Sequence, residues 1–211
     1  MAEVKFCGLM RAEDARMAAT CGARYAGVIL TTSLRALDAP SAAELFEGVR
    51  DSVHRVGVFG REEPDDIARL AREAGLDVIQ LHGDTTPAIV RRLHFDTGLR
   101  IWAAVRVAGN ELPDNFESIA AAADAIVLDT FSPDMLGGTG QRLDWAALAA
   151  PVSRRRGKAS LVLAGGLTPG NVRQAIEALS PDVVDVSSGV EISPGVKDHG
   201  LMRAFAEAAR G

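Results

Sequence analysis

The sequence predicts an α/β fold, a (β/α)8 barrel of the TIM-barrel class with eight parallel strands. Short apolar runs typical of buried parallel strands occur eight times along the 211 residues. Their starts are roughly 20 to 35 residues apart, which is the length of one strand–loop–helix unit. Segments rich in Ala, Leu, Glu and Arg with helical spacing lie between them. Eight alternating units of this kind predict a closed barrel ringed by helices.

The elements follow one another without interruption. The predicted strands cover residues 4–7, 25–30, 55–59, 78–81, 100–105, 125–128, 160–164 and 183–186. Helical segments between them include 11–21, 41–49, 64–74 and 169–179. Gly22 and Gly75 stand where helix C-caps are expected, and Ser41 followed by Glu44 is typical of a capping box.

The longest gap between strands follows the sixth strand. A long loop over residues 130–145 is expected there, and it would act as a lid. No linker, low-complexity run or charge block divides the chain, so residues 1–211 are interpreted as a single barrel domain. The competing interpretation is an open, doubly wound parallel sheet.

The amino-acid composition argues against several classes of binding partner. The formal net charge of −5 argues against a nucleic-acid surface. No apolar run reaches the ~18 residues of a membrane span, and the N-terminus enters a strand at once, so we expect no signal peptide and no membrane partner. Two cysteines, Cys7 and Cys21, form no disulfide framework and fit a reducing cytoplasm.

Small residues follow the seventh and eighth strands and predict a phosphate site. Glycine and serine just past a strand let backbone N–H groups approach an anion closely. Loops after strands 7 and 8 commonly hold phosphate in this fold. Two ordinary strand-to-loop junctions are the alternative. The residues concerned are Gly165, Gly166, Ser187, Ser188 and Gly189.

Other reactive side chains are expected at the same end of the barrel, because the chemistry of this fold takes place where the strands end. Each has an ordinary interpretation as well. A lone cysteine is often a small buried hydrophobe, an aspartate is often a helix cap, an arginine is often solvated and a histidine is often structural. The side chains are Cys7, Arg35, His82, Asp129 and Asp185.

The chain resembles the phosphoribosylanthranilate isomerase family over nearly its whole length. Many separate motifs in the right order carry this resemblance. They are KFCGLMRAEDA at 5–15, SLR at 33–35, VGVF at 56–59, QLHGD at 80–84, LDT at 128–130, GGTGQRLDW at 137–145, AGGLTPGNV at 164–172 and DVSSGVEISPGVKD at 185–198.

The resemblance implies an acid–base isomerase of tryptophan biosynthesis that needs no metal and no coenzyme. Its substrate would be a small phosphorylated aminosugar, N-(5-phosphoribosyl)anthranilate, rearranged from aminoaldose to aminoketose. The resemblance makes Cys7 the base and Asp129 the acid, and it places residues 137–140 in a lid beside them. It implies that Arg35, Gln80, His82 and Asp185 bind substrate, with Arg35 on the anthranilate carboxylate. Members of the family occur as monomers and as homodimers.

One further contact is predicted from strand periodicity. Lys5 and Asp185 should both face the barrel interior on neighbouring strands. A buried lysine is costly unless it is paired, so a Lys5–Asp185 contact below the site is our hypothesis.

Two other functions are weighed against this one. The first is another isomerase, aldolase or cyclase on a phosphate-binding barrel. The second is a barrel that has lost catalysis and only binds a ligand or partner. The presence of both Cys7 and Asp129 argues against the second.

Overall fold

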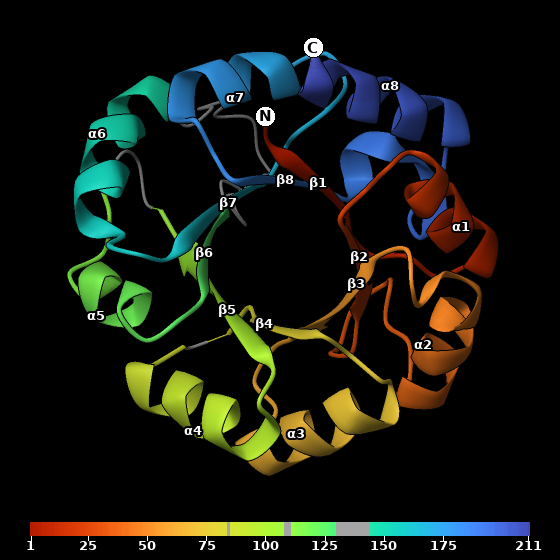
Figure 1. Cartoon of the computed structure of the whole chain (residues 1–211), viewed down its shortest axis with the longest axis horizontal. Coiled ribbons are helices and arrows are strands. Elements are labelled where there is room, and N and C mark those ends of the chain that lie inside the picture. The colour runs from red at the N-terminus through yellow and green to blue at the C-terminus, as the bar shows by residue number, and fades with distance from the viewer. Residues whose placement is uncertain (84, 108–110, 130–143) are drawn as a thin grey trace.

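The computed structural model describes residues 1–83, 85–107, 111–129 and 144–211. Its centre is a closed barrel of eight parallel strands in chain order (Figure 1). The strands are β1 (Glu3–Phe6), β2 (Tyr25–Ile29), β3 (His54–Phe59), β4 (Val78–Leu81), β5 (Arg100–Arg106), β6 (Ala125–Asp129), β7 (Ser160–Ala164) and β8 (Val183–Val186). Each lies within one residue of its predicted bounds. The predicted barrel is confirmed, and the open sheet is excluded because β1 pairs with β8.

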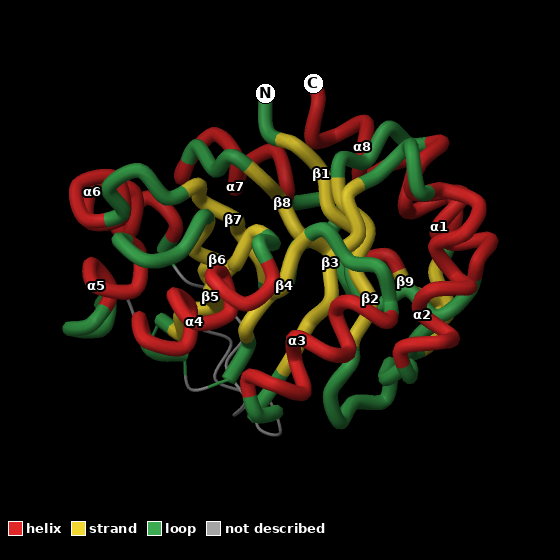
Figure 2. The backbone as a smooth tube through the Cα atoms, turned by 60° about the horizontal axis from the view of Figure 1, so that its bottom comes forward, coloured by secondary structure: helices red, strands yellow, loops and turns green. Residues whose placement is uncertain are grey.

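Helices form a ring outside the strands (Figures 1 and 2). They are α1 (Ala12–Thr20), α2 (Ala39–Phe46), α3 (Pro64–Glu73), α4 (Pro87–Thr97), α5 (Phe116–Ala120), α6 (Trp145–Arg155), α7 (Val172–Leu179) and α8 (His199–Arg210). Both termini lie at one end of the barrel, the end where the strands begin (Figure 2). Among the described helices, none has the length and hydropathy needed to cross a membrane.

Two apolar layers hold the barrel together, because successive side chains of a strand point to opposite faces. The larger layer packs strand residues such as Phe6 and Ile126 against the helices. The smaller layer fills the barrel interior, where Tyr25 and Trp102 meet edge to face with ring centroids 4.8 Å apart. Apolar side chains thus occupy the interior towards the start of the strands, and polar side chains are left for its other end.

The predicted capping box at Ser41 is wrong. Helix α2 begins at Ala39, and its N-cap is Asp38, whose side chain accepts a hydrogen bond from the Ser41 backbone N–H at 2.9 Å. An aspartate caps as well as a serine, and Pro40 fits the first turn of a helix. The helix therefore starts earlier than the Ser41–Glu44 spacing indicates.

The seventh helix starts later than predicted. The chain at Thr168 makes a turn, and α7 begins only at Val172. The Asn171 side chain holds this turn by accepting from the Thr168 N–H at 2.8 Å and donating to the Gly166 carbonyl at 3.0 Å. Gly22 and Gly75 each follow the end of a helix with positive φ, as expected of residues that terminate helices.

A small antiparallel hairpin follows β8 and was not predicted. It begins after the 3₁₀ turn η2 (Ser188–Val190) and consists of β9 (Glu191–Ser193) and β10 (Val196–Lys197). The turn between them contains Gly195 with φ +81°, a conformation that favours glycine. The predicted lid over 130–145 falls largely outside the described residues.

Candidate active site

A buried ion pair lies beneath the predicted base. Lys5 Nζ donates to Asp185 Oδ2 at 2.7 Å, and the two residues are direct partners in the β1–β8 register. The predicted contact is confirmed. Gly27 on β2 makes room for this arrangement, since a Cβ there would lie 3.1 Å from Lys5 Cε and 3.2 Å from Cys7 Sγ.

Cys7 directly follows β1 at the C-terminal end of the barrel, and it is buried. Burial raises the pKa of its thiol above the ordinary value, and the positive charge of Lys5 is the main influence in the opposite direction. For Lys5 itself, burial lowers the pKa but the Asp185 carboxylate outweighs it, so its pKa is raised. Lys5 is therefore a fixed cation beside a thiol that is mostly protonated at neutral pH.

The predicted acid lies across from Cys7 at the C-terminal end of the barrel, which we call the mouth. Asp129 is the last residue of β6, and β1 and β6 are three strand steps apart around the eight-stranded barrel. His82, which follows β4, places Nε2 at 3.0 Å from Asp129 Oδ2. The histidine thus orients the carboxyl group, a contact that the sequence did not predict because β4 and β6 are not neighbours.

Two buried oxygen atoms lack a hydrogen-bond partner among the described residues. They are Gln80 Oε1 on β4 and Asp185 Oδ1 on β8. Gln80 shares its face of β4 with the interior residue Val78. Buried polar atoms are rarely left unpaired, so both oxygens are available to accept hydrogen bonds from a ligand.

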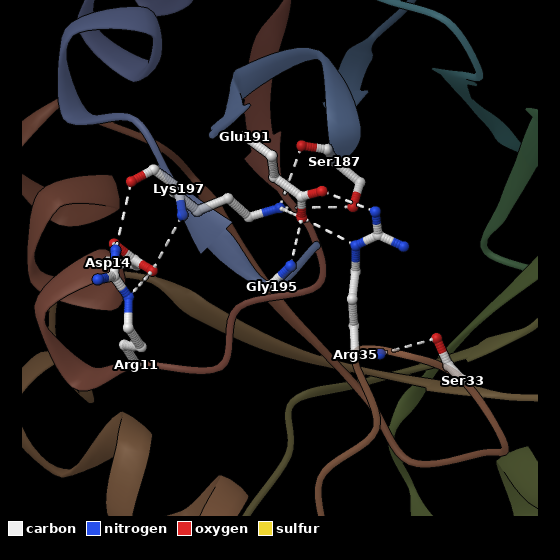
Figure 3. Close-up of polar contacts among 8 residues, drawn as sticks. All are labelled: Arg11, Asp14, Ser33, Arg35, Ser187, Glu191, Gly195 and Lys197. Carbon is white, nitrogen blue, oxygen red and sulfur yellow. Dashed lines mark hydrogen bonds and ion pairs between the residues drawn. The ribbon is translucent and has the colours of Figure 1, made fainter. Parts of the chain in front are cut away.

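Arg35 is in the loop after β2, and its guanidinium forms two hydrogen bonds with Glu191, at 2.8 and 2.6 Å (Figure 3). Lys197 Nζ binds the same carboxylate at 2.8 Å. Burial acts to raise the pKa of Glu191, but the hydrogen bonds from Arg35 and Lys197 outweigh it and lower the pKa to about 2. Glu191 is therefore ionised throughout the working pH range of a protein.

The two loops predicted to bind phosphate lie against each other. A Cβ added to Gly189 would sit 1.9 Å from the carbonyl oxygen of Leu167, in the loop after β7. Gly165 and Gly166 have φ of +84° and +63°, in the left-handed region. Ser187 precedes η2, and the first N–H groups of a helical turn have no partner within it. The loops thus bring glycine and serine backbone together.

Arg35 and the serine loop converge next to the thiol. Gly8, which follows Cys7, has φ +65°, and a Cβ there would lie 2.8 Å from Arg35 Cδ and 2.9 Å from Ser187 Oγ. The structure therefore groups Cys7, Arg35 and Ser187, and it pairs His82 with Asp129 across the mouth. Glu191 and Lys197 were given no role from the sequence. The Ser193-Pro194-Gly195 turn is the signal that could have predicted their hairpin.

The fold and these side chains define a class, the (β/α)8 barrel enzymes that act on small anionic substrates at the C-terminal ends of the strands. Comparison with known proteins identifies the family. Residues 4–208 match the family described as N-(5'phosphoribosyl)anthranilate (PRA) isomerase. The chain belongs to this family, and so it is an isomerase of tryptophan biosynthesis.

Individual relatives cover the full length. The chain is 41% identical over 218 residues to the N-(5'-phosphoribosyl)anthranilate isomerase of Geobacter sp. strain M21, spanning 100% of this chain and 98% of that one. The phosphoribosyl anthranilate isomerase of Thermotoga maritima is 35% identical with a TM-score of 0.90, and each chain is covered completely. A structure of the same enzyme type in complex with reduced 1-(o-carboxyphenylamino)-1-deoxyribulose 5-phosphate is 34% identical, has a TM-score of 0.87 and covers both chains completely.

Proposed function

We propose that this chain converts N-(5-phosphoribosyl)anthranilate to 1-(2-carboxyphenylamino)-1-deoxyribulose 5-phosphate, with Cys7 as general base and Asp129 as general acid. The observation that carries this assignment is the position of the two groups. Both lie at the C-terminal ends of strands: Cys7 directly follows β1 and Asp129 is the last residue of β6, three strand steps away. A ribose between them would meet an acid on one side and a base on the other.

The reaction needs one proton given and one proton taken. Asp129 donates a proton to the furanose ring oxygen, the ring opens, and the nitrogen lone pair forms a Schiff base at C1. The Cys7 thiolate then removes the proton from C2, and the C–H electron pair becomes the C1–C2 double bond of an enaminol. Protonation at C1 and loss of the hydroxyl proton at C2 give the aminoketose. Positioned acids and bases of this kind each contribute roughly 10²–10⁴-fold.

The remaining predicted residues are proposed to bind the two charged ends of the substrate and the ribose between them. The phosphate is assigned to the backbone N–H groups of Gly165, Gly166, Ser187, Ser188 and Gly189. Arg35 receives the anthranilate carboxylate, since a guanidinium matches a carboxylate with two parallel hydrogen bonds. Gln80 and Asp185 each offer to substrate hydroxyl or amine groups an oxygen that has no partner among the described residues. His82 lies near the aromatic ring of the substrate.

The aldolase alternative requires a lysine that attacks a carbonyl as a free amine. Lys5 is fully buried, is bound to Asp185 at 2.7 Å and has a raised pKa. Its ammonium group is therefore a poor nucleophile. This geometry favours a proton-transfer reaction, with Lys5 as a positioning residue below Cys7.

We infer further that residues 1–211 act as one catalytic domain in the cytoplasm, as a monomer or a homodimer. The substrate is the small-molecule partner, and neither a nucleic acid nor a coenzyme takes part.

The test is the loss of either proton-transfer group. Cys7→Ala and Asp129→Asn should each lower kcat by roughly 10²–10⁴-fold, because the thiol and the acidic proton act mainly in the transition state. Cys21→Ala, which changes the other buried cysteine, is the matched control and should keep full activity. Steady-state kinetics with N-(5-phosphoribosyl)anthranilate measures the effect. A rate within about tenfold of wild type in either variant would contradict the assignment.

A further inference from the structure

Within the part of the chain that the structure describes, Arg35 uses one edge of its guanidinium for hydrogen bonds. Nε donates to Glu191 Oε1 and Nη2 donates to Oε2, which is the side-on bidentate geometry (Figure 3). An arginine has five N–H donors in a planar fork. Among the described residues, the end-on edge, formed by Nη1 and the second hydrogen of Nη2, has no hydrogen-bond partner. That edge has the geometry to receive a second carboxylate.

The carboxylate of Glu191 accepts several hydrogen bonds from cationic side chains and a backbone N–H of this chain. Its Oε1 accepts from Arg35 Nε at 2.8 Å, from Lys197 Nζ at 2.8 Å and from the Gly195 N–H at 3.3 Å. Its side chain is only 5% exposed. A carboxylate engaged in this way has little capacity left to bind a substrate or to move a proton. Its role is therefore to hold the cationic side chains that bind it.

Lys197, which pairs with Glu191 across the β9–β10 hairpin, anchors this carboxylate. Its ammonium group is fully buried, and besides Glu191 it donates to the backbone oxygen of Ser187 at 3.1 Å and lies 3.4 Å from Ser187 Oγ. Burial lowers the pKa of Lys197, and Glu191 opposes that effect. The β9–β10 hairpin thus presents an oriented carboxylate to the loop after β2, which comes from the other end of the chain.

We propose that Glu191 is a positioning residue for the isomerase reaction, and that it fixes the guanidinium of Arg35 so that its free edge faces the anthranilate carboxylate of the substrate. Lys197 holds Glu191 in place. This inference rests on the proposed function, in which Arg35 binds that carboxylate.

The physical reason is pre-organisation. A free arginine side chain loses rotamer freedom when it is fixed, and binding that must order it first is weaker. Gly8 leaves space for the stem of Arg35, whose Cδ would lie 2.8 Å from a Cβ there, and Glu191 fixes the tip. The ordering is thus complete before substrate arrives.

The decisive variant is Glu191→Asp. It keeps the negative charge beside buried Lys197, but it shortens the side chain by one methylene and withdraws the carboxylate from Arg35. We expect KM for N-(5-phosphoribosyl)anthranilate to rise roughly tenfold, the effect of losing hydrogen bonds to a charged group, with a smaller change in kcat. Inhibition by anthranilate should weaken in parallel, whereas inhibition by inorganic phosphate should stay as in wild type.

A double-variant cycle tests whether Glu191 acts through Arg35. Arg35→Ala alone should raise KM, and Arg35→Ala/Glu191→Asp should be no worse than Arg35→Ala. Full additivity of the two effects, or an equal loss of phosphate and anthranilate inhibition in Glu191→Asp, would overturn the inference. An Arg35→Ala variant with unchanged KM would instead refute the role of Arg35 in the proposed function.

Asp77→Asn supplies the matched control. Asp77 precedes β4 and forms the same bidentate pair with Arg55, at 2.8 and 2.8 Å, at the start of the strands, away from the mouth. Its loss should lower thermal stability without changing KM. A similar rise in KM in this control would show that any weakened ion pair loosens the site, and that Glu191 has no particular role.

Discussion

Cys7 carries a thiol that is reactive as the thiolate, but its burial disfavours that form. The thiol lies at the end of β1, and burial raises its pKa although Lys5 and Lys197 act to lower it. A base must be the thiolate, so only a small fraction of the free enzyme carries the active form at neutral pH. The rising limb of the pH profile should therefore follow the ionisation of Cys7.

This environment can be measured by alkylation. Iodoacetamide should modify Cys7 with a midpoint pH above ~8.5, the ordinary value for a free cysteine, because burial disfavours the thiolate. Mass spectrometry of peptides separates Cys7 from Cys21, and Cys7→Ser identifies the modified site. A midpoint at or below that of a free cysteine would show that the lysines outweigh burial, and that the thiolate is already formed in the free enzyme.

The loops that follow β7 and β8 can approach each other closely because residue 189 is a glycine. Gly189 lies in the 3₁₀ turn η2, and its Cα faces the Leu167 carbonyl so closely that a Cβ would come within 1.9 Å. Only glycine lets the two loops approach in this way. The proposed phosphate site depends on that approach, because its N–H groups come from both loops.

Gly189→Ala should therefore push the loops apart and weaken phosphate binding. We expect the inhibition constant of inorganic phosphate and KM to rise together by at least tenfold, as charge-assisted hydrogen bonds from one loop are lost. Gly48→Ala is the matched control, since Gly48 lies in the 3₁₀ turn η1 (Glu47–Val49) and a Cβ there meets nothing within 4 Å. Equal phosphate inhibition in Gly189→Ala and Gly48→Ala would place the anion elsewhere.

The whole barrel closes where its first and last strands meet. β1 and β8 pair from Glu3↔Val183 to Phe6↔Val186, and the Lys5–Asp185 ion pair crosses this seam inside the barrel. The pKa of Lys5 is raised in the folded state. Its contribution to stability is therefore fully present below the unfolded lysine pKa of ~10.4, and is lost as pH rises through the higher folded value.

Removing one partner of this pair should destabilise the entire fold. Asp185→Asn leaves the Lys5 charge buried without its counter-ion, which costs about 3–5 kcal/mol, and the loss is measured as a lower midpoint of urea unfolding at neutral pH. Asp66→Asn, which breaks the exposed pair with Arg69 at 3.0 Å, should cost less than about 1 kcal/mol. Equal stability of the two variants would mean that the barrel seam does not depend on the buried pair.

The sequence by itself determined the barrel and the ends of its strands. Strand and helix periods are local properties of side-chain order, so eight alternating units predicted the closed fold and placed Cys7 and Asp129 at the ends of β1 and β6. Face alternation on neighbouring strands also predicted the Lys5–Asp185 contact. Each of these inferences needs only residue spacing and the order of strands.

Only the tertiary structure decided how the loops meet over the mouth. Arg35 and Glu191 are 156 positions apart and His82 meets Asp129 from a non-adjacent strand, so no local period relates them. Even the start of α2 could not be read from the sequence, because Asp38 and Ser41 can both cap a helix. The structure uses Asp38, so α2 begins at Ala39. Such contacts depend on loop conformations, which many weak interactions across the whole fold select together, whereas burial of an apolar face already selects the strands.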